Sequence, residues 1–207
     1  RKVPYTFEEL VKTFKQPKVA SLLFTRLFYS LGFTTFESSF TLFAIRRLNL
    51  ELSQTSFVLA YVGVVLVITQ GLLVGKVAKK FAEYVVVKYL MPLAILLLAV
   101  YSFSSNLATL VLFLTPLSIS SGLIGVSITS LTTKSVSKDK LGGTLGIFSS
   151  ADSLVRIVSP LIGAVVIQYV GSRFLGVVVA FFVSIGFVIF RTKFLPNLAT
   201  MTKHTTV

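Results

Sequence analysis

The chain alternates long apolar runs with short polar and basic connections. Six of these runs approach the length of about 20 residues that a helix needs to cross the hydrocarbon core of a bilayer. They lie at about 19–45, 55–75, 85–104, 107–131, 144–170 and 173–191. Because the connections are short, runs that are neighbours in sequence are expected to pack antiparallel. The pattern predicts an all-α membrane protein formed by a six-transmembrane-helix bundle.

More polar segments flank this bundle. Residues 6–16 combine a capping box with apolar side chains at helical spacing, which predicts a short amphipathic helix on the membrane surface. An ordinary first turn leading into the next span fits the segment equally well. The chain therefore divides into a cytoplasmic amphipathic lead-in at 1–18, the transmembrane bundle at 19–191 and a cytoplasmic polar tail at 192–207. It begins with Arg1 rather than methionine, so we expect a trimmed or cleaved chain or a separate piece of a longer one.

The composition agrees with a membrane protein and argues against an enzyme. Hydrophobic residues make up 54% of the chain and charged residues only 13%, whereas soluble domains are about 25% charged. The chain has no cysteine, and its single histidine, His204, lies in the polar tail, so disulfides, thiolate catalysis and a metal site are not expected. The sequence contains no GxxxxGK loop, HExxH motif or serine–histidine arrangement. We expect neither an enzyme nor a cofactor.

The net charge of +13 is distributed as membrane topology requires. With both termini in the cytoplasm, fifteen of the 20 basic residues lie on the cytoplasmic side and three, Arg46, Arg47 and Arg173, lie outside. Such an excess follows the positive-inside rule. No basic stripe is interleaved with aromatic residues, so nucleic acid is not an expected partner. We expect an integral multi-pass protein of either the bacterial inner membrane or a eukaryotic organelle membrane.

The predicted spans differ in polarity near their centres. The third and sixth carry almost no polar residue there, as expected of helices that face lipid, whereas the other four carry ionisable, amide or serine side chains. This difference predicts a cavity lined by the first, second, fourth and fifth spans. Gly71 and Gly75, and likewise Gly142 and Gly146, are four residues apart, a spacing that lets helix backbones pack closely.

Arg26 and Glu37 share one face of the first span. They are eleven residues apart. At about 100° per residue, their side chains point within about 20° of the same direction around the helix axis. Tyr29 and Phe33 lie between them on this face. In an alternative interpretation, the Arg26 side chain extends to the lipid headgroups on the cytoplasmic side of the membrane. A carboxylate such as Glu37 cannot reach so far, and we therefore expect it to be functional.

Asp152 and Arg156 lie four residues apart on the fifth span, with the acid first, which is the favourable order for an ion pair within a helix. Two interpretations follow. The pair neutralises itself inside the bundle, or Arg156, near the centre of the bilayer, exchanges between Asp152 and Glu37. Exchange between two acids would couple helix movement to a proton, which is a common use of charges inside a membrane.

Several stretches of the chain match the helices of a known family. They are LGFTTFES at 31–38, AYVG at 60–63, QGLLVG at 70–75, GGTLG at 142–146, SLVR at 153–156 and PLIG at 160–163. In these stretches the chain resembles helices seven, eight and eleven of the major facilitator superfamily, close to the tetracycline-efflux-like drug:proton antiporters. The chain as a whole resembles the carboxy-terminal half of such a transporter.

The resemblance implies a function and a set of site residues. It implies proton-coupled export of a small organic or drug-like solute by alternating access, with helices seven, eight, ten and eleven around the cavity. Glu37 would be the protonatable group, and Asp152 and Arg156 the charge-relay pair. The cavity wall would include Arg26, Tyr29, Phe33 and Gln70.

The chain departs from the family pattern in its motifs and in its extent. The loop motif GxxxDRxGR reads GKVAKKFAE at 75–83, with partly inverted charges, and GPxxGG reads SPLIGA at 159–164. The family moves solutes between two six-helix bundles, so this chain needs an amino-terminal six-helix half, a second copy of itself or a larger membrane complex. The alternative function is a non-transporting subunit or scaffold of such a complex.

Overall fold

A computed structural model describes residues 16–198, so the predicted amphipathic lead-in, apart from residues 16–18, and the end of the tail lie outside the described residues. Every regular element in this part of the chain is a helix, which confirms the all-α prediction there. The α-helices are α2 (Pro17–Leu48), α3 (Leu52–Ile68), α4 (Val74–Lys80), α5 (Glu83–Tyr101), α6 (Leu107–Lys134), α7 (Leu141–Val165) and α8 (Leu175–Ile189). Short π-helical or 3-10 segments join or extend them at η1 (Thr69–Leu73), η2 (Lys138–Lys140), η3 (Val166–Gly171), η4 (Ser172–Phe174) and η5 (Phe190–Phe194).

The local sequence explains where these helices begin and end. Pro17 lies in the first turn of α2, where its missing N–H costs no hydrogen bond. The same helix ends at Leu48, and its C-cap residue Asn49 has a left-handed backbone (φ 52°) and an N–H that donates to the carbonyl oxygen of Ala44. Asn106 caps α6, because its side-chain oxygen accepts a hydrogen bond from the N–H of Thr109 at 2.9 Å. These caps lie in the short connections that the sequence pattern predicts.

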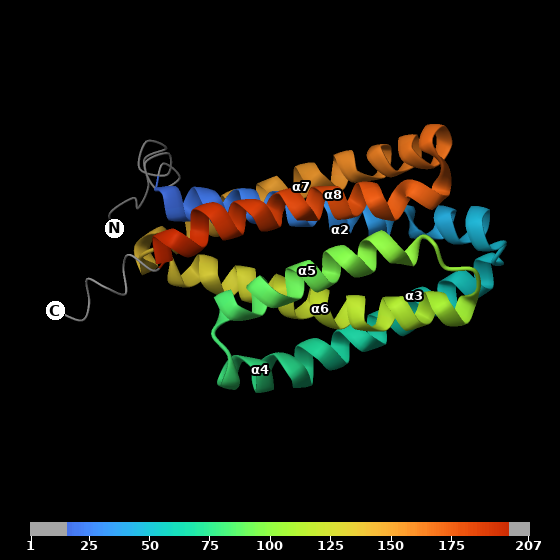
Figure 1. The fold of residues 1–207 in the computed structure, drawn as a ribbon. Helices are drawn as coiled ribbons and strands as arrows, with labels where there is room; N and C mark the ends of the chain where they lie inside the picture. Colours follow the sequence, from blue (N-terminus) through green and yellow to red (C-terminus); the bar gives the residue numbers. More distant parts are fainter. Residues whose placement is uncertain (1–15, 199–207) are drawn as a thin grey trace.

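Five helical segments in the described part of the chain are long and apolar enough to cross a membrane. The fifth, Lys138–Leu198, has 61 residues and would be about 90 Å long as one straight helix, against a hydrocarbon thickness of about 30 Å. The chain reverses at Gly171, whose φ of 106° suits only glycine. As a result α7 and α8 run in opposite directions (Figure 1). Six spans with both termini in the cytoplasm stay a prediction.

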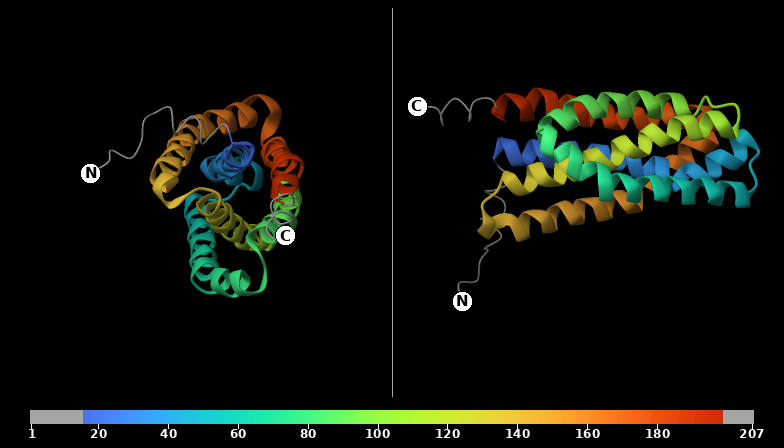
Figure 2. Two further views of the ribbon diagram at one scale, coloured as in Figure 1. Left: turned by 90° about the vertical axis from the view of Figure 1, so that its left-hand side faces the viewer. Right: turned by 90° about the horizontal axis from the view of Figure 1, so that it is seen from below.

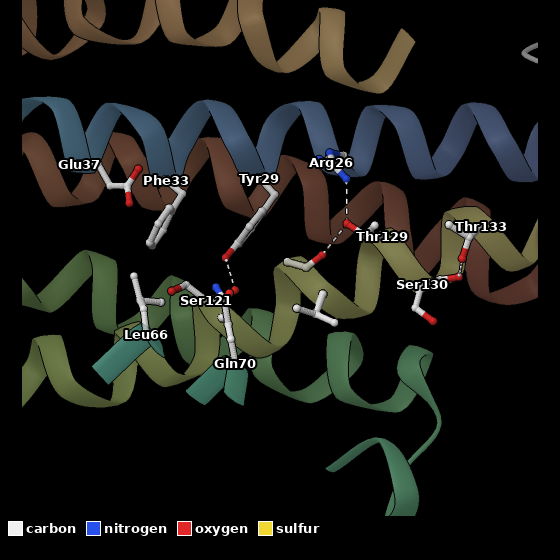
Figure 3. A pocket seen from close by; sticks show the side chains of 13 residues that line it. Arg26, Tyr29, Phe33, Glu37, Leu66, Gln70, Ser121, Thr129, Ser130 and Thr133 are labelled. Atoms are coloured by element: carbon white, nitrogen blue, oxygen red, sulfur yellow. Dashed lines mark hydrogen bonds between the residues drawn. The ribbon is translucent and has the colours of Figure 1, made fainter. Parts of the chain in front are cut away.

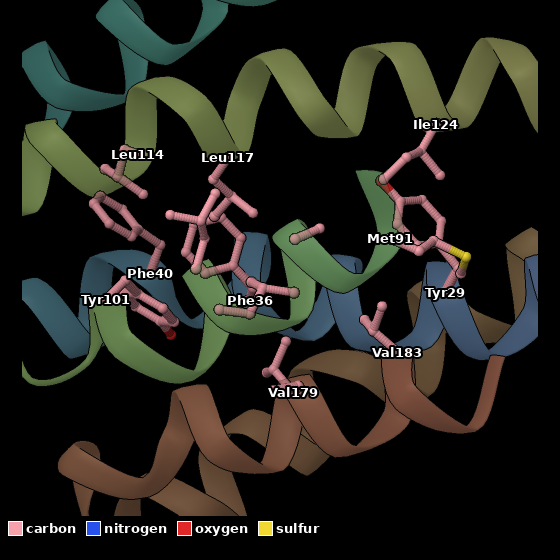
Figure 4. Close-up of a cluster of buried hydrophobic side chains, with 14 of the residues drawn as sticks. Tyr29, Phe36, Phe40, Met91, Tyr101, Leu114, Leu117, Ile124, Val179 and Val183 are labelled. Atoms are coloured by element: carbon pink, nitrogen blue, oxygen red, sulfur yellow. The ribbon is translucent and has the colours of Figure 1, made fainter. Parts of the chain in front are cut away.

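Helix α2 passes through the middle of the bundle and packs against α7 and α8, as the end-on view in Figure 2 shows. Its apolar side chains meet those of α5, α6 and α8 in the buried core drawn in Figure 4. The rings of Phe36 and Tyr101 meet edge to face with centroids 4.9 Å apart. The α2 backbone approaches α8 closely at Gly32, where a Cβ would lie only 2.6 Å from the Val183 side chain. The core therefore fixes α2 relative to its neighbours.

Two sequence predictions about packing find no support within the described residues. The glycine pairs do not mark close helix contacts, because a Cβ would meet no described atom within 4 Å at Gly71, Gly75, Gly142 or Gly146. The least buried span is the continuous α3–η1–α4 segment, with 11% of its most apolar stretch buried against 33% for α5, although α5 is the span predicted to face lipid. Spacing and polarity identify a face that suits packing, but they do not show which neighbour covers it.

Candidate functional site

A cavity of about 640 Å³ lies between α2, α6 and the α3–η1 segment. Arg26, Tyr29, Phe33 and Glu37 line one wall at intervals of three or four residues along α2, and Gln70 of η1 lies across from them (Figure 3). The structure thus brings the predicted cavity residues together around one space. Among the described residues, α7 contributes none to the cavity lining, so three spans surround it rather than the four predicted.

Arg26 is held by side chains from α6 and α7. Its Nε and Nη2 donate to Oδ2 of Asp152 at 3.1 and 2.7 Å, and its Nη1 donates to Oγ1 of Thr129 at 3.0 Å. Ser30 donates to the other carboxylate oxygen, Oδ1, of Asp152 at 3.0 Å. The Arg26 and Asp152 side chains are only 25% and 24% exposed, and charge-assisted hydrogen bonds offset the cost of burying them. The cluster ties α2, α6 and α7 together.

This arrangement corrects one prediction, because Asp152 pairs with Arg26 instead of with Arg156. Arg26 lies in the cavity lining, where it was predicted. Within the described residues Arg156 takes part in neither of the two ion pairs, and its side chain is exposed. The helical spacing of Asp152 and Arg156 allows a contact, but α2 offers the acid two guanidinium N–H groups and a hydroxyl, which together satisfy both carboxylate oxygens.

Glu37 lies at the opposite end of the same α2 face from Arg26 (Figure 3). Its carboxylate forms neither of the ion pairs in the described part of the chain, and the cation whose charge acts on it is Arg156. Glu37, Phe33 and Leu66 also border an adjoining, mainly apolar cavity of about 240 Å³. A carboxylate therefore stands without an ion-pair partner at the junction of a polar and an apolar space.

The aromatic residues between these charges form a continuous wall. The rings of Tyr29 and Phe33 are stacked, with centroids 6.0 Å apart and planes inclined by 10°. The hydroxyl of Tyr29 donates to the carbonyl oxygen of Ser121 at 3.4 Å, which fixes the ring against α6. Across the cavity, Gln70 lies in a π-helical segment, an irregularity that occurs often at functional sites.

The serine-rich α6 contributes less polarity to the cavity than its sequence indicates. The hydroxyls of Ser118, Ser120 and Ser121 donate to carbonyl oxygens of their own helix at 2.7, 2.7 and 3.0 Å. Hydroxyls satisfied in this way lose part of their capacity to bind a solute. Of the serines on α6, Ser121 and Ser130 line the cavity.

Sequence reasoning missed two contacts at the site. It did not identify Thr129 as a partner of Arg26, because that contact depends on how α6 packs on α2. It also missed the ion pair between Glu83 and Lys134, to which Ser130 adds a hydrogen bond to the Glu83 carboxylate at 2.9 Å. The acid at position 83 in the inverted motif was a usable signal that an ion pair forms there, but the sequence does not select Lys134 over the nearby lysines of the same segment.

A helical membrane bundle with a charged, partly aromatic cavity is the architecture of a membrane transporter. Comparison with family models agrees: the model of the Major Facilitator Superfamily matches residues 22–204. The chain belongs to the major facilitator superfamily. This membership confirms the predicted superfamily, which is a family of membrane transporters and not of enzymes.

Curated relatives of the chain are solute carriers. Rat solute carrier family 22 member 18 is 25% identical over 164 residues, which cover 77% of this chain and 39% of the relative. The mouse protein of the same name is 26% identical over 164 residues, which again cover 77% of this chain and 39% of the relative. Human solute carrier family 67 member A1 is 22% identical over 167 residues, or 81% of this chain and 39% of the relative. The chain thus spans about two fifths of the length of these relatives.

A solved structure shares the fold. The crystal structure of the peptide transporter POT in complex with sulfate matches with a TM-score of 0.73 over 83% of this chain and 36% of that chain, at 16% identity. This likeness concerns the fold alone. The position of the chain in the carboxy-terminal half and its place near the tetracycline-efflux-like branch stay predictions.

Proposed function

We propose that this chain is the carboxy-terminal six-helix half of a proton-coupled transporter that exports a small amphiphilic or drug-like organic solute. In this proposal the solute binds in the cavity between this bundle and an amino-terminal one, and rocking of the two bundles exposes it to either side. Membership in the superfamily and the cavity of about 640 Å³, which is in the range of small-molecule sites of about 300–1,000 Å³, support it.

The proton-coupling proposal rests on the lack of an ion-pair partner for Glu37 among the described residues. Glu37 lines the cavity and takes part in neither ion pair of the described residues, whereas both oxygens of Asp152 are occupied. Carboxylates inside membrane helices mark proton pathways in many transporters. Glu37 can gain or lose a proton without breaking an ion pair, and we assign it the coupling proton.

Arg156 takes the role of counter-charge to Glu37 in this mechanism. Its charge acts on Glu37, but the two groups are not joined in an ion pair in this structure. When Glu37 is ionised, Arg156 stabilises the carboxylate; when Glu37 is protonated, Arg156 is released. The two states differ in charge at one place, which is what a proton-driven switch between conformations requires.

We assign Asp152 a different part from the predicted relay with Arg156. Its bonds to Arg26 and Ser30, together with the bond from Arg26 to Thr129, close the bundle across α2, α6 and α7. Under the proposed topology this cluster lies toward the cytoplasm. It would keep that end of the bundle closed while Glu37 exchanges its proton.

The proposed partner is an amino-terminal six-helix half. The chain spans 39% of its rat relative, so more than half of such a protein lies outside the matched region. The two glycine pairs, at 71 and 75 and at 142 and 146, meet no described neighbour and offer flat faces suited to helices of another bundle. The membrane is either the bacterial inner membrane or that of a eukaryotic organelle.

The test is solute flux in vesicles that contain the intact protein and a pH gradient, with ethidium as the amphiphilic probe. Glu37→Gln and Arg156→Ala are each expected to abolish gradient-driven uptake, and Glu51→Gln, which changes an acid outside the cavity lining, is the matched control. If both cavity variants retain wild-type flux, the mechanism is wrong. If the wild type itself moves no probe in either direction, the scaffold function becomes the better explanation.

A further inference from the structure

We propose that a groove between α4 and α5 binds an anionic phospholipid, with one acyl chain in the groove and the phosphate at the lysines beside it. This site shares no lining residue with the transport cavity. It requires only that the bundle lies in a membrane, so it does not depend on the proposed transport function.

The groove lies between α4, α5 and α6, beside the turn that joins α4 to α5 (Figure 1). Its volume is about 320 Å³, near the lower end of the range of ligand sites of about 300–1,000 Å³. Val77 and Phe81 contribute from the α4 side, Val85 and Tyr89 from α5, and Leu123 from α6. All lining residues are aliphatic or aromatic, which suits a hydrocarbon chain and not a polar solute.

Two large aromatic side chains of the groove are open to the surroundings. Phe81 is 55% exposed and Tyr89 is 65% exposed, so the described residues leave much of both rings uncovered. Tyrosine is enriched where a membrane meets water, because its ring is apolar and its hydroxyl is polar. Tyr89 therefore indicates the level at which an acyl chain passes into its headgroup.

Three lysines lie next to residues that line this groove and form no ion pair among the described residues. Lys79 and Lys80 end α4 directly before Phe81, and the Nζ of Lys88 lies 5.4 Å from the centroid of the Tyr89 ring. Among the described residues, none of the three is in an ion pair. The acid of the same turn, Glu83, is bound by Lys134 and Ser130. The phosphate of a membrane lipid would supply a negative charge at this position.

Only one class of ligand satisfies both parts of the site. A free phosphate would meet the lysines but leave the apolar groove uncovered. A zwitterionic phospholipid would fill the groove, but its own ammonium group competes with the lysines for its phosphate. A phospholipid with a net negative headgroup matches both, and basic pockets between membrane helices bind such headgroups.

The test measures lipid retained by the intact protein in detergent, using native mass spectrometry with equal amounts of phosphatidylglycerol and phosphatidylcholine of the same chain length. The wild type is expected to retain phosphatidylglycerol preferentially. If each lysine contributes about fivefold in affinity, replacing Lys79, Lys80 and Lys88 together by alanine lowers phosphatidylglycerol binding on the order of 100-fold. The matched control is the double variant Lys138→Ala and Lys140→Ala, which removes charges of the same sign outside the groove and is expected to keep the preference.

A second variant tests the groove without changing charge. Val85→Trp fills it and is expected to reduce binding of phosphatidylglycerol while all lysines remain. Equal retention of the two lipids by the wild type would overturn the proposal, as would a triple lysine variant that keeps the preference. Displacement of the lipid by inorganic phosphate at equal concentration would also overturn it, because the groove would then contribute nothing.

Discussion

Asp152 and Glu37 are two carboxylates on helices of one bundle, and among the described residues only Asp152 has an ion-pair partner. Asp152 accepts hydrogen bonds from Arg26 and Ser30, so its charge is part of the contact between α7 and α2. Glu37 lines the cavity and is outside both ion pairs of the described residues. An acid that holds helices together cannot change charge without loosening them, whereas an acid without such contacts can. The difference separates a structural charge from a candidate proton site.

The largest expected effect on stability comes from Asp152→Asn. It leaves the Arg26 guanidinium three-quarters buried without its counter-charge. Breaking a buried pair costs about 3–5 kcal/mol, and partial exposure lowers this to about 3 kcal/mol. Thermal unfolding in detergent checks the result, and Asp139→Asn, at a residue outside both ion pairs, is the control. If the two variants melt alike, Asp152 does not hold the bundle together.

The second-largest loss of stability is expected from Gly163→Ala, because it moves α7, the helix that carries Asp152. A Cβ at this position would lie 2.8 Å from the Cβ of Ser39 on α2, so α7 has to shift away and Asp152 with it. Such overpacking costs about 2 kcal/mol. Gly146→Ala is the control on the same helix, because a Cβ there meets no described atom within 4 Å. Equal melting temperatures for the two variants would contradict the close α2–α7 contact.

A smaller effect is expected from Arg26→Lys, which keeps the charge but removes the forked geometry. The guanidinium donates to Asp152 and to Thr129 at the same time, and a lysine ammonium on a different stem cannot reproduce that arrangement. The expected loss is about 1 kcal/mol. The measurement compares the free energy of unfolding lost through Arg26→Lys in the wild type with the loss in protein that carries Thr129→Val. The loss should be smaller in the Thr129→Val protein. An equal loss in both would exclude Thr129 from the cluster.

The smallest effect on stability is expected from Glu37→Gln. The substitution keeps size and shape, and the carboxylate has no ion-pair partner to lose within the described residues, so the free energy of unfolding should change by less than about 0.5 kcal/mol. Comparison of its melting curve with that of Asp152→Asn checks this. A loss as large as that of Asp152→Asn would make Glu37 structural and remove the contrast between the two acids.

The sequence predicted the contents of the cavity wall better than the contacts of its charges. Arg26, Tyr29, Phe33 and Glu37 line one cavity because helical periodicity within α2 places them on one face. The partner of Asp152 was predicted wrongly because spacing detects only neighbours on the same helix. Arg26 and Asp152 are 126 residues apart in sequence, and only the packing of α2 against α7 brings them together.

Glycines show the same limit of sequence reasoning. Both predicted glycine pairs meet no described neighbour, whereas Gly32 and Gly163, which no spacing rule selected, lie against other helices. A glycine allows close approach, but the contact depends on which helix is opposite. The all-helical fold could be predicted because the length and apolar character of each run are local properties, while helix pairing is not.

The most direct test of the proton role of Glu37 separates coupling from movement of the solute. Intact protein carrying Glu37→Gln is placed in vesicles, and two properties of ethidium are measured. The first is its accumulation against its own concentration gradient when a pH gradient is applied. The second is its exchange between the two sides of the membrane when the pH is equal. The account predicts that the variant exchanges the dye at the wild-type rate and accumulates none above protein-free vesicles. Accumulation at the wild-type level would contradict it.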